Sequence, residues 1–286
     1  MTIDAEIFED HQNDTEEVDQ SIMREEFDKA LMELKNKKTP GVDEIPAELI
    51  QNCGYNTKKI IYEMIKKCYE TGQVPSDFTK CIIVPIPKKT TAKTCEQHRT
   101  LNLISHASKI LTRIVLKRME PVIDELLTEE QFGFRRGKGT REAILALRQV
   151  IEKQNRKRKT TFIAFVDLKK AFDNDGRIIK SLYKQEIGVI RCENSREEAE
   201  IRKGCTLSPS LFNLYVQEAV NKVREEIEVG IRINGERIDM LRFADDIAVI
   251  TDNEEDLQNI LEIMNLAMKN EYNMKNKQSK NESLCL

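Results

Sequence analysis

Three aspartates of this chain stand at the ends of apolar runs, where an uncompensated charge is costly. Asp245 and Asp246 are adjacent in LRFADDIAVI, and Asp167 ends the apolar run of TFIAFVDL. Neighbouring carboxylates repel one another unless a cation neutralises them, and oxygen ligands select hard divalent ions such as Mg²⁺. Three carboxylates brought together could hold two such ions, an arrangement that supports in-line nucleotidyl transfer. The alternative for ADD is an ordinary hairpin turn, in which aspartate is favoured.

The elements that must position these aspartates are strands. Residues 162–166 form an apolar run that predicts a buried strand, and residues 231–251 alternate like paired strands. Another short strand, Cys81–Pro85, runs into a basic loop. Since helices and strands are mixed without regular βαβ alternation, we predict an α+β fold rather than a doubly wound sheet. The three aspartates would then lie on neighbouring strands.

Apolar residues at helical spacing predict helices around these strands. One covers about Ile22–Lys35, another lies in YNTKKIIYEMIKKCYETGQVP and ends near Gly72, and a third is NEEDLQNILEIMNLAMK. In LISHASKILTRIVLKRMEPVIDELL we expect an interruption near Pro121. In SPSLFNLYVQEAVNKVREEI we predict Ser208 as the N-cap and Pro209 as the first helical residue.

Length and composition limit the class of protein. The 286 residues suffice for one large domain or two medium ones with a real core. No run of eighteen apolar residues exists, so no membrane span is expected, and MTIDAEIFEDHQND lacks the features of a signal peptide. The seven cysteines form no C-x-x-C pair, which argues against a disulfide framework and a zinc site. We therefore expect an intracellular protein, in the nucleus or the cytoplasm.

Positive charge is concentrated in one part of the chain. Residues 80–160 contain nineteen Lys or Arg against eight Asp or Glu. Such a block suits a polyanionic partner, although a solvated helical face with arginine-rich turns explains it equally well. Its last part, RKRK at Arg156–Lys159, fits a nucleic-acid contact or a nuclear address, with a charged turn before a strand as the alternative.

Six segments resemble, in order, the motifs of one family. FVDLKKAFD, GCTLSPSLFNLYV and FADDIAVI are similar to the palm motifs of reverse transcriptases, most closely those of non-long-terminal-repeat (LINE-type) retrotransposons. KKTPGVDEIPAELI, IIVPIPKKTTAKTCEQHRTLNLIS and EEQFGFRRGKGTREAI resemble the segments that precede the palm in that family. The resemblance runs from about Glu26 to about Met274, and six motifs in the family's order are far more specific than any one of them.

The resemblance implies the right-hand fold of polymerases, with an antiparallel palm sheet packed on helices. It places a helical extension at 21–79 and fingers at 80–160, whereas the acidic and weakly apolar composition of residues 1–20 predicts a loose tail. The palm would occupy 161–274 and a disordered tail 275–286, with no thumb.

The resemblance also implies roles for the aspartates. Asp167 and Asp245 would be the principal metal ligands and Asp246 the third carboxylate, with help from the backbone carbonyl of Leu168. The ions would be two Mg²⁺, which Mn²⁺ could replace. Phe172 lies where the family's steric gate excludes a ribose 2′-hydroxyl, so it would select deoxynucleotides.

Further contacts follow from the same resemblance. Lys88 or Lys89 and Arg99 match the family's triphosphate contacts, a role that suits a point charge and a bidentate guanidinium. Lys203 and Gly204 fall in the nucleotide site. The expected contacts to nucleic-acid phosphates are Arg135, Arg136, Lys138 and Arg141. The implied partners are an RNA template, a DNA primer and deoxynucleoside triphosphates, with no membrane.

Two departures from the family's pattern support a second hypothesis. The stretch after Asp173 is short, and Lys203 stands where the family has the glutamine that contacts the incoming nucleotide. They favour a truncated or decaying element copy, an inactive remnant that at most binds RNA, whereas the intact aspartates favour an RNA-directed DNA polymerase. Phe172 and Ala244 argue against a third class, RNA-dependent RNA polymerases.

Overall fold

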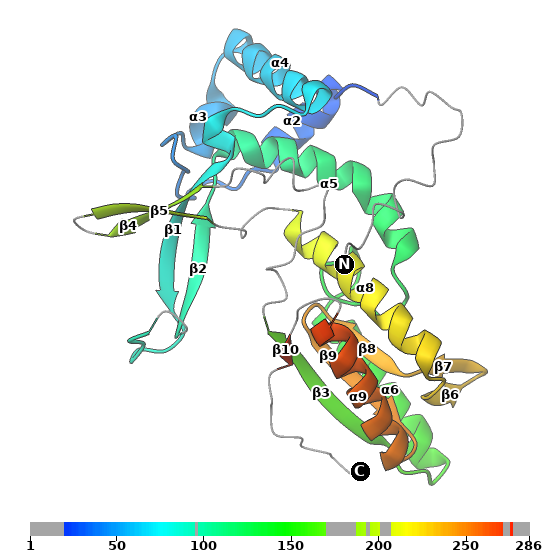
Figure 1. Cartoon of the computed structure of the whole chain (residues 1–286). Coiled ribbons are helices and arrows are strands. Elements are labelled where there is room, and N and C mark those ends of the chain that lie inside the picture. The colour runs from blue at the N-terminus through cyan, green and yellow to red at the C-terminus, as the bar shows by residue number, and fades with distance from the viewer. Residues whose placement is uncertain are drawn as a thin grey trace. The chain divides into compact units, whose positions relative to one another are not determined.

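The computed structural model describes residues 20–94, 97–169, 187–192, 195–200, 207–270 and 275–276. These residues divide into two compact units (Figure 1). Unit 1 contains the described residues up to Arg118 and those between 187 and 200, and unit 2 contains the rest from Met119 onward. Among the described residues, no helix combines the length and the apolar character that crossing a bilayer needs.

Helices form the core of unit 1. They are α2 (Arg24–Met32), α3 (Ala47–Asn52), α4 (Tyr55–Thr71), the 3-10 turn η1 (Ser76–Phe78) and the first part of α5 (His106–Leu126). Their apolar faces meet in one cluster that includes Phe27, Ile65 and Ile110, all 0% exposed. The predicted end of α4 is confirmed, because its C-cap Gly72 has a φ of 65°, which glycine adopts without strain.

A four-stranded sheet completes unit 1. Its strands are β1 (Lys80–Pro87), β2 (His98–Leu103), β4 (Ile187–Cys192) and β5 (Ser195–Glu200), in the order β2-β1-β4-β5. The pairs β1–β2 and β4–β5 are antiparallel, whereas β1–β4 is parallel. The predicted strand at Cys81–Pro85 is therefore confirmed, and it is one part of a longer hairpin.

An antiparallel sheet lies at the centre of unit 2. Its strands are β3 (Phe162–Lys169), β8 (Met240–Phe243), β9 (Asp246–Thr251) and β10 (Lys275–Asn276), in the order β10-β3-β9-β8. A separate hairpin joins β6 (Ile231–Ile233) to β7 (Glu236–Ile238). Its turn is Asn234-Gly235, and both residues have positive φ, as a tight two-residue hairpin requires. The prediction of paired strands in 231–251 is confirmed.

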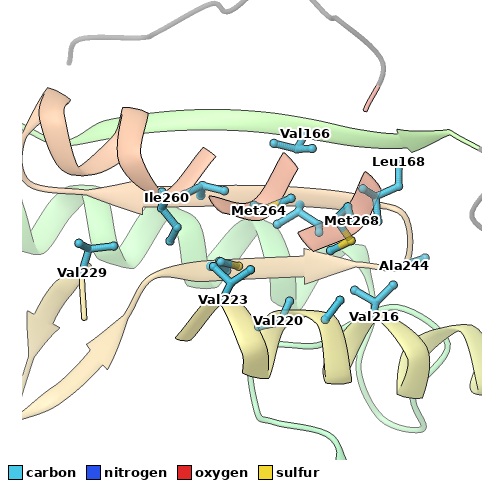
Figure 2. Packing of buried hydrophobic residues seen from close by; sticks show 14 of the residues in the cluster. Val166, Leu168, Val216, Val220, Val223, Val229, Ala244, Ile260, Met264 and Met268 are labelled. Carbon is cyan, nitrogen blue, oxygen red and sulfur yellow. The ribbon is translucent and has the colours of Figure 1, made fainter. Parts of the chain in front are cut away.

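Both faces of this sheet are covered. Successive side chains of a strand point to opposite faces, so the apolar residues of each strand pack in two layers. Alternate sheet residues such as Val166, Leu168 and Val249 pack on α8 (Ser208–Glu226) and α9 (Glu254–Asn270). Figure 2 shows Val216 of α8 and Met268 of α9 in this layer. The sheet residues that point to the opposite face pack on α6 (Thr140–Arg156) and the β6–β7 hairpin. They are Ile163, Leu241, Ala248 and Ile250. The predicted α+β class with an antiparallel sheet on helices is confirmed.

Two local predictions are wrong. The helix at 106–126 is not interrupted, since α5 continues through Pro121. Pro121 lies on the exposed side of the helix, where a proline is tolerated more easily than in a packed interior. Ser208 is not the N-cap of α8, because Leu207 takes that position and Ser208 already lies in the first turn. The Ser208 hydroxyl is buried and has no hydrogen-bond partner among the described residues.

Candidate active site

Asp245 lies in a two-residue turn between β8 and β9. Phe243 pairs with Asp246 across the hairpin, which leaves Ala244 and Asp245 as the turn. Ala244 has a φ of 57°, a conformation that costs free energy in any residue with a Cβ. Asp245 is half-buried and Asp246 is exposed. Of the two interpretations of ADD, the turn is therefore correct for its geometry, and it does not exclude a chemical role.

The strand of Asp167 lies directly beside this turn. β3 and β9 are antiparallel, and their register sets Asp167 opposite Asp246. The amide of Leu168 donates to the carbonyl of Asp245, with an N···O distance of 3.1 Å. The prediction that these aspartates occupy neighbouring strands is confirmed at the level of the backbone.

Asp245 is a half-buried acid on this turn. Among the described residues, no Lys or Arg forms an ion pair with Asp245. No group of three or more His, Cys, Asp or Glu that could hold a metal occurs within the described residues, which exclude the side chain of Asp167. A half-buried carboxylate without a cationic partner favours a bound cation, and carboxylate oxygens suit Mg²⁺. The donors described so far fit such an ion.

The segment Thr128–Gly133 packs against the strand that leads into the turn. The amide of Phe132 donates to the Arg242 carbonyl at 2.8 Å, and the amide of Arg242 donates to the Glu130 carbonyl at 2.9 Å. This segment therefore extends the sheet beyond β8 for a short distance, although it is far away in sequence.

A buried guanidinium lies beneath the same strand. Arg242 is 0% exposed, and its Nη2 donates to Thr128 Oγ1 at 2.7 Å and to Gln217 Oε1 at 2.5 Å. Burial lowers the pKa of the Arg242 guanidinium to about 10, so the group is still charged at neutral pH. Its neighbours Arg224, which is half-buried, and Asp239, which is buried, form an ion pair in which Arg224 Nε donates to Asp239 Oδ2 at 2.8 Å.

The predicted triphosphate contacts lie on the β1–β2 hairpin of unit 1. Lys88 and Lys89 follow β1, and Arg99 pairs with Ile86 in the register of β2. The amide of Lys88 donates to the carbonyl of Gln97 at 2.8 Å, which continues the hairpin past β1. All three basic residues are exposed, so the hairpin presents them to solvent.

The four basic residues after Phe134 have two different environments. Arg135 is bonded within the fold, to the Asp124 carboxylate and to the Thr128 carbonyl at 2.7 Å. Lys138 Nζ donates to Glu129 Oε2 at 2.7 Å. These cations hold the pKa values of the Asp124 and Glu129 carboxyls below their usual range.

The other two, Arg136 and Arg141, are exposed, and no ion pair of theirs occurs in the described part of the chain. Phe172, Lys203, Gly204 and the short stretch after Asp173 lie outside the described residues.

Several residues that support the turn were missed by sequence reasoning. They are Gln131, Gly133, Asn213 and Arg242, all buried in unit 2. Arg242 gives a signal, because it is a charge inside an otherwise apolar strand. Asn213 gives a weaker one, as a polar residue in the apolar run LFNLYV. Gln131 and Gly133 carry no such signal.

The comparisons with known proteins agree on one family. A family model described as reverse transcriptase (RNA-dependent DNA polymerase) matches residues 86–285. A retrovirus-related Pol polyprotein from type-1 retrotransposable element R2 of Popillia japonica is 26% identical over 82% of this chain and 35% of its own length. The corresponding R2 protein of Nasonia vitripennis is 28% identical over 65% of this chain and 20% of its own length.

A solved structure shows a similar fold. Telomerase from Candida tropicalis, in complex with a fragment of telomeric RNA, has a TM-score of 0.50 and 15% identity. The match covers 79% of this chain and 44% of the telomerase chain. This chain thus spans about a third or less of the length of the R2 relatives and less than half of the telomerase.

Proposed function

Because the chain belongs to the reverse transcriptase family, we propose that it is an RNA-directed DNA polymerase domain of a LINE-type element. It would add deoxynucleotides to a primer 3′-hydroxyl on an RNA template. One observation carries the proposal: a two-residue turn holds Asp245 against the strand of Asp167. This is the place where the family's chemistry requires its carboxylates.

Asp167, Asp245 and Asp246 would hold two divalent ions, Mg²⁺ or Mn²⁺, with the Leu168 carbonyl as a further ligand. The antiparallel register sets Asp167 directly opposite Asp246, and this pairing of the backbones supports a shared site. When bound, such ions lower the pKa of an attacking hydroxyl and stabilise the charge on a leaving pyrophosphate. The contribution of the chain itself is to fix the carboxylates on a turn that is bonded on both of its sides.

The β1–β2 hairpin would bind the incoming nucleotide. Lys88 or Lys89 would contact its triphosphate as a point charge, and Arg99 as a planar fork. Their exposure on one hairpin is consistent with a group that meets a ligand from solvent. We retain Phe172 as the proposed sugar gate and Lys203 and Gly204 as further nucleotide contacts, on the family resemblance alone.

Template or primer phosphates would be bound by the basic segment of unit 2. We assign the stronger contacts to Arg136 and Arg141, because both are exposed and neither forms an ion pair with a described residue. Arg135 and Lys138 already neutralise Asp124 and Glu129, so their contribution to phosphate binding would be smaller. Residues 161–274 would form the palm and residues 80–160 would supply the fingers.

Primer extension tests the proposed function. The chain is incubated with a poly(rA)·oligo(dT) template, dTTP and Mg²⁺ or Mn²⁺, beside the variants Asp245→Asn and Asp252→Asn. Asp252 is an exposed aspartate at the far end of β9 and serves as the matched control. We expect extension by the wild type and Asp252→Asn, and its loss in Asp245→Asn. Extension that survives Asp245→Asn, or none from a folded wild type, contradicts the proposal; the second result leaves an RNA-binding remnant.

A further inference from the structure

A buried glutamine joins the segment ahead of α6 to the turn that carries Asp245. Gln131 is 0% exposed. Its Oε1 accepts from the amide of Gly133 at 3.1 Å and from the amide of Ala244 at 3.4 Å. One side-chain oxygen therefore bonds two backbone amides that are remote in sequence. One of those amides belongs to the residue immediately before Asp245.

Asn213 of α8 bonds the nitrogen of the Gln131 side-chain amide. Gln131 Nε2 donates to Asn213 Oδ1 at 3.0 Å, and Asn213 Nδ2 donates to the Gly133 carbonyl at 2.7 Å. Asn213 is also 0% exposed. Each of the two amide side chains both donates and accepts, so their orientations are determined and no polar atom of the pair is left without a partner.

The backbone at Gly133 lies so close to the Ala244-Asp245 turn that there is no space for a side chain between them. A Cβ placed on Gly133 would lie 2.3 Å from the Ala244 nitrogen and 2.9 Å from the Phe243 carbonyl carbon. Gly133 is thus in direct contact with the turn. The Gln131 side chain lies where the two backbones meet and bonds an amide from each of them.

The turn itself needs such support. Ala244 has a φ of 57°, which a residue with a Cβ keeps only where its surroundings impose it. On one side the Leu168 amide donates to the Asp245 carbonyl, and on the other Gln131 accepts from the Ala244 amide. Without the second bond, a buried amide of a strained turn would lose its partner.

We propose that Gln131 and Asn213 are positioning residues that hold the Ala244-Asp245 turn and so determine where the metal-binding carboxylates lie. The proposal rests on the proposed function for its catalytic consequence, but its structural part does not. Neither residue touches a substrate. They act through the turn, so their loss lowers metal affinity and turnover, and it leaves nucleotide affinity unchanged when the metal is saturating. A displacement of about 1 Å at a reacting group can reduce a rate by about a hundredfold.

Three variants test this assignment. Gln131→Met keeps the volume of the side chain but removes both hydrogen-bonding groups. Gln131→Glu restores the acceptor for the Ala244 and Gly133 amides. Gln154→Met is the matched control, because Gln154 is a 2% exposed glutamine on α6 of the same unit, outside this network. The measurements are exchange of the Ala244 amide in ¹⁵N-alanine-labelled protein, Mn²⁺ binding by electron paramagnetic resonance, and kcat and KM for dTTP.

In Gln131→Met we expect amide exchange at Ala244 to be about tenfold faster, Mn²⁺ affinity to be about tenfold weaker and kcat to fall at least about tenfold. At a saturating concentration of Mn²⁺, KM for dTTP should stay within about twofold, because the chain's own proposed nucleotide contacts are elsewhere. Gln131→Glu should recover part of each loss, and Gln154→Met should behave as wild type in all three measurements. Equal behaviour of Gln131→Met and Gln154→Met overturns the assignment.

The two proposals can fail separately. Amide exchange at Ala244 needs neither metal nor substrate, so it reports on the turn even if the chain does not polymerise. A wild type without Mn²⁺ binding or extension contradicts the proposed function alone. Unchanged exchange in Gln131→Met contradicts the positioning role alone.

Discussion

Two β-hairpins carry the proposed chemistry of this chain, and they are built in opposite ways. The β8–β9 hairpin closes with two residues, and buried side chains surround its turn. In the other hairpin, residues 88–97 join β1 to β2, and β1 loses burial toward the tip, where Lys88 and Lys89 are exposed. Each hairpin belongs to a different unit of the chain.

The difference matches the demands of the two proposed tasks. Carboxylates that share metal ions must be held to a fraction of an ångström, which a short turn bonded on both sides can do. Long cationic side chains that meet a flexible triphosphate need charge and reach more than fixed positions. In the proposed function, the same secondary structure would therefore serve as a fixed support in unit 2 and as an exposed carrier of charge in unit 1.

Conservative substitutions in both hairpins would sharpen this comparison most. Asp245→Glu lengthens the side chain by one methylene on a turn that cannot adjust, so we expect kcat/KM in primer extension to fall by about a hundredfold. Lys89→Arg, on the exposed hairpin, should cost less than about threefold. Similar losses in the two variants would break the comparison.

A methyl group at Gly133 tests how firmly the β8–β9 turn is packed. Because the new Cβ would lie 2.3 Å from the Ala244 nitrogen, Gly133→Ala should lower the free energy of unfolding in urea by about 2 kcal/mol or more. Gly139→Ala is the control, since its Cβ would meet only the Glu142 carboxylate at 3.2 Å, and we expect a loss below about 1 kcal/mol. A Gly133→Ala protein as stable as Gly139→Ala would contradict the close approach.

Removal of a cation from the exposed hairpin should affect binding rather than stability. We expect Arg99→Ala to raise KM for dTTP by about tenfold, with the unfolding midpoint in urea unchanged, because Arg99 is exposed. Thr100→Ala, at the next exposed position of β2, should leave KM as in wild type. A fall in kcat at constant KM would give Arg99 a different role.

The smallest expected effect is a pH dependence that originates in unit 1. Burial lowers the pKa of His106 below its ordinary value of 6.5. Its contribution to stability is complete above pH 6.5 and is lost as the pH falls, because the unfolded chain then takes up a proton that folded His106 resists. Unit 2 contains none of the three histidines, which are His11, His98 and His106.

Urea unfolding of wild type between pH 7.5 and 5.5 should therefore show a decline of less than about 1.4 kcal/mol per pH unit, the limit for one proton. His106→Asn should flatten the slope. A slope that persists in this variant would assign the pH dependence to other groups.

Local patterns in the sequence predicted much of the scaffold. The apolar run at 162–166 and the alternation of 231–251 predicted the strands that form most of the central sheet of unit 2 and the β6–β7 hairpin. The Pro121 and Ser208 predictions failed for a local reason. Exposure lets a helix tolerate proline, and a helix start is uncertain by a residue when several cap candidates are adjacent.

The sequence by itself determined that aspartates end apolar strands, which strands these are and which family they resemble, because such signals depend on neighbours a few residues away. Only the tertiary structure decided what holds the aspartates in place. The bond from Ala244 to Gln131 spans 113 residues, and the bond from Gln131 to Asn213 spans 82. A glutamine becomes a support only when packing removes it from water and leaves one set of partners, and no spacing in the sequence encodes that burial.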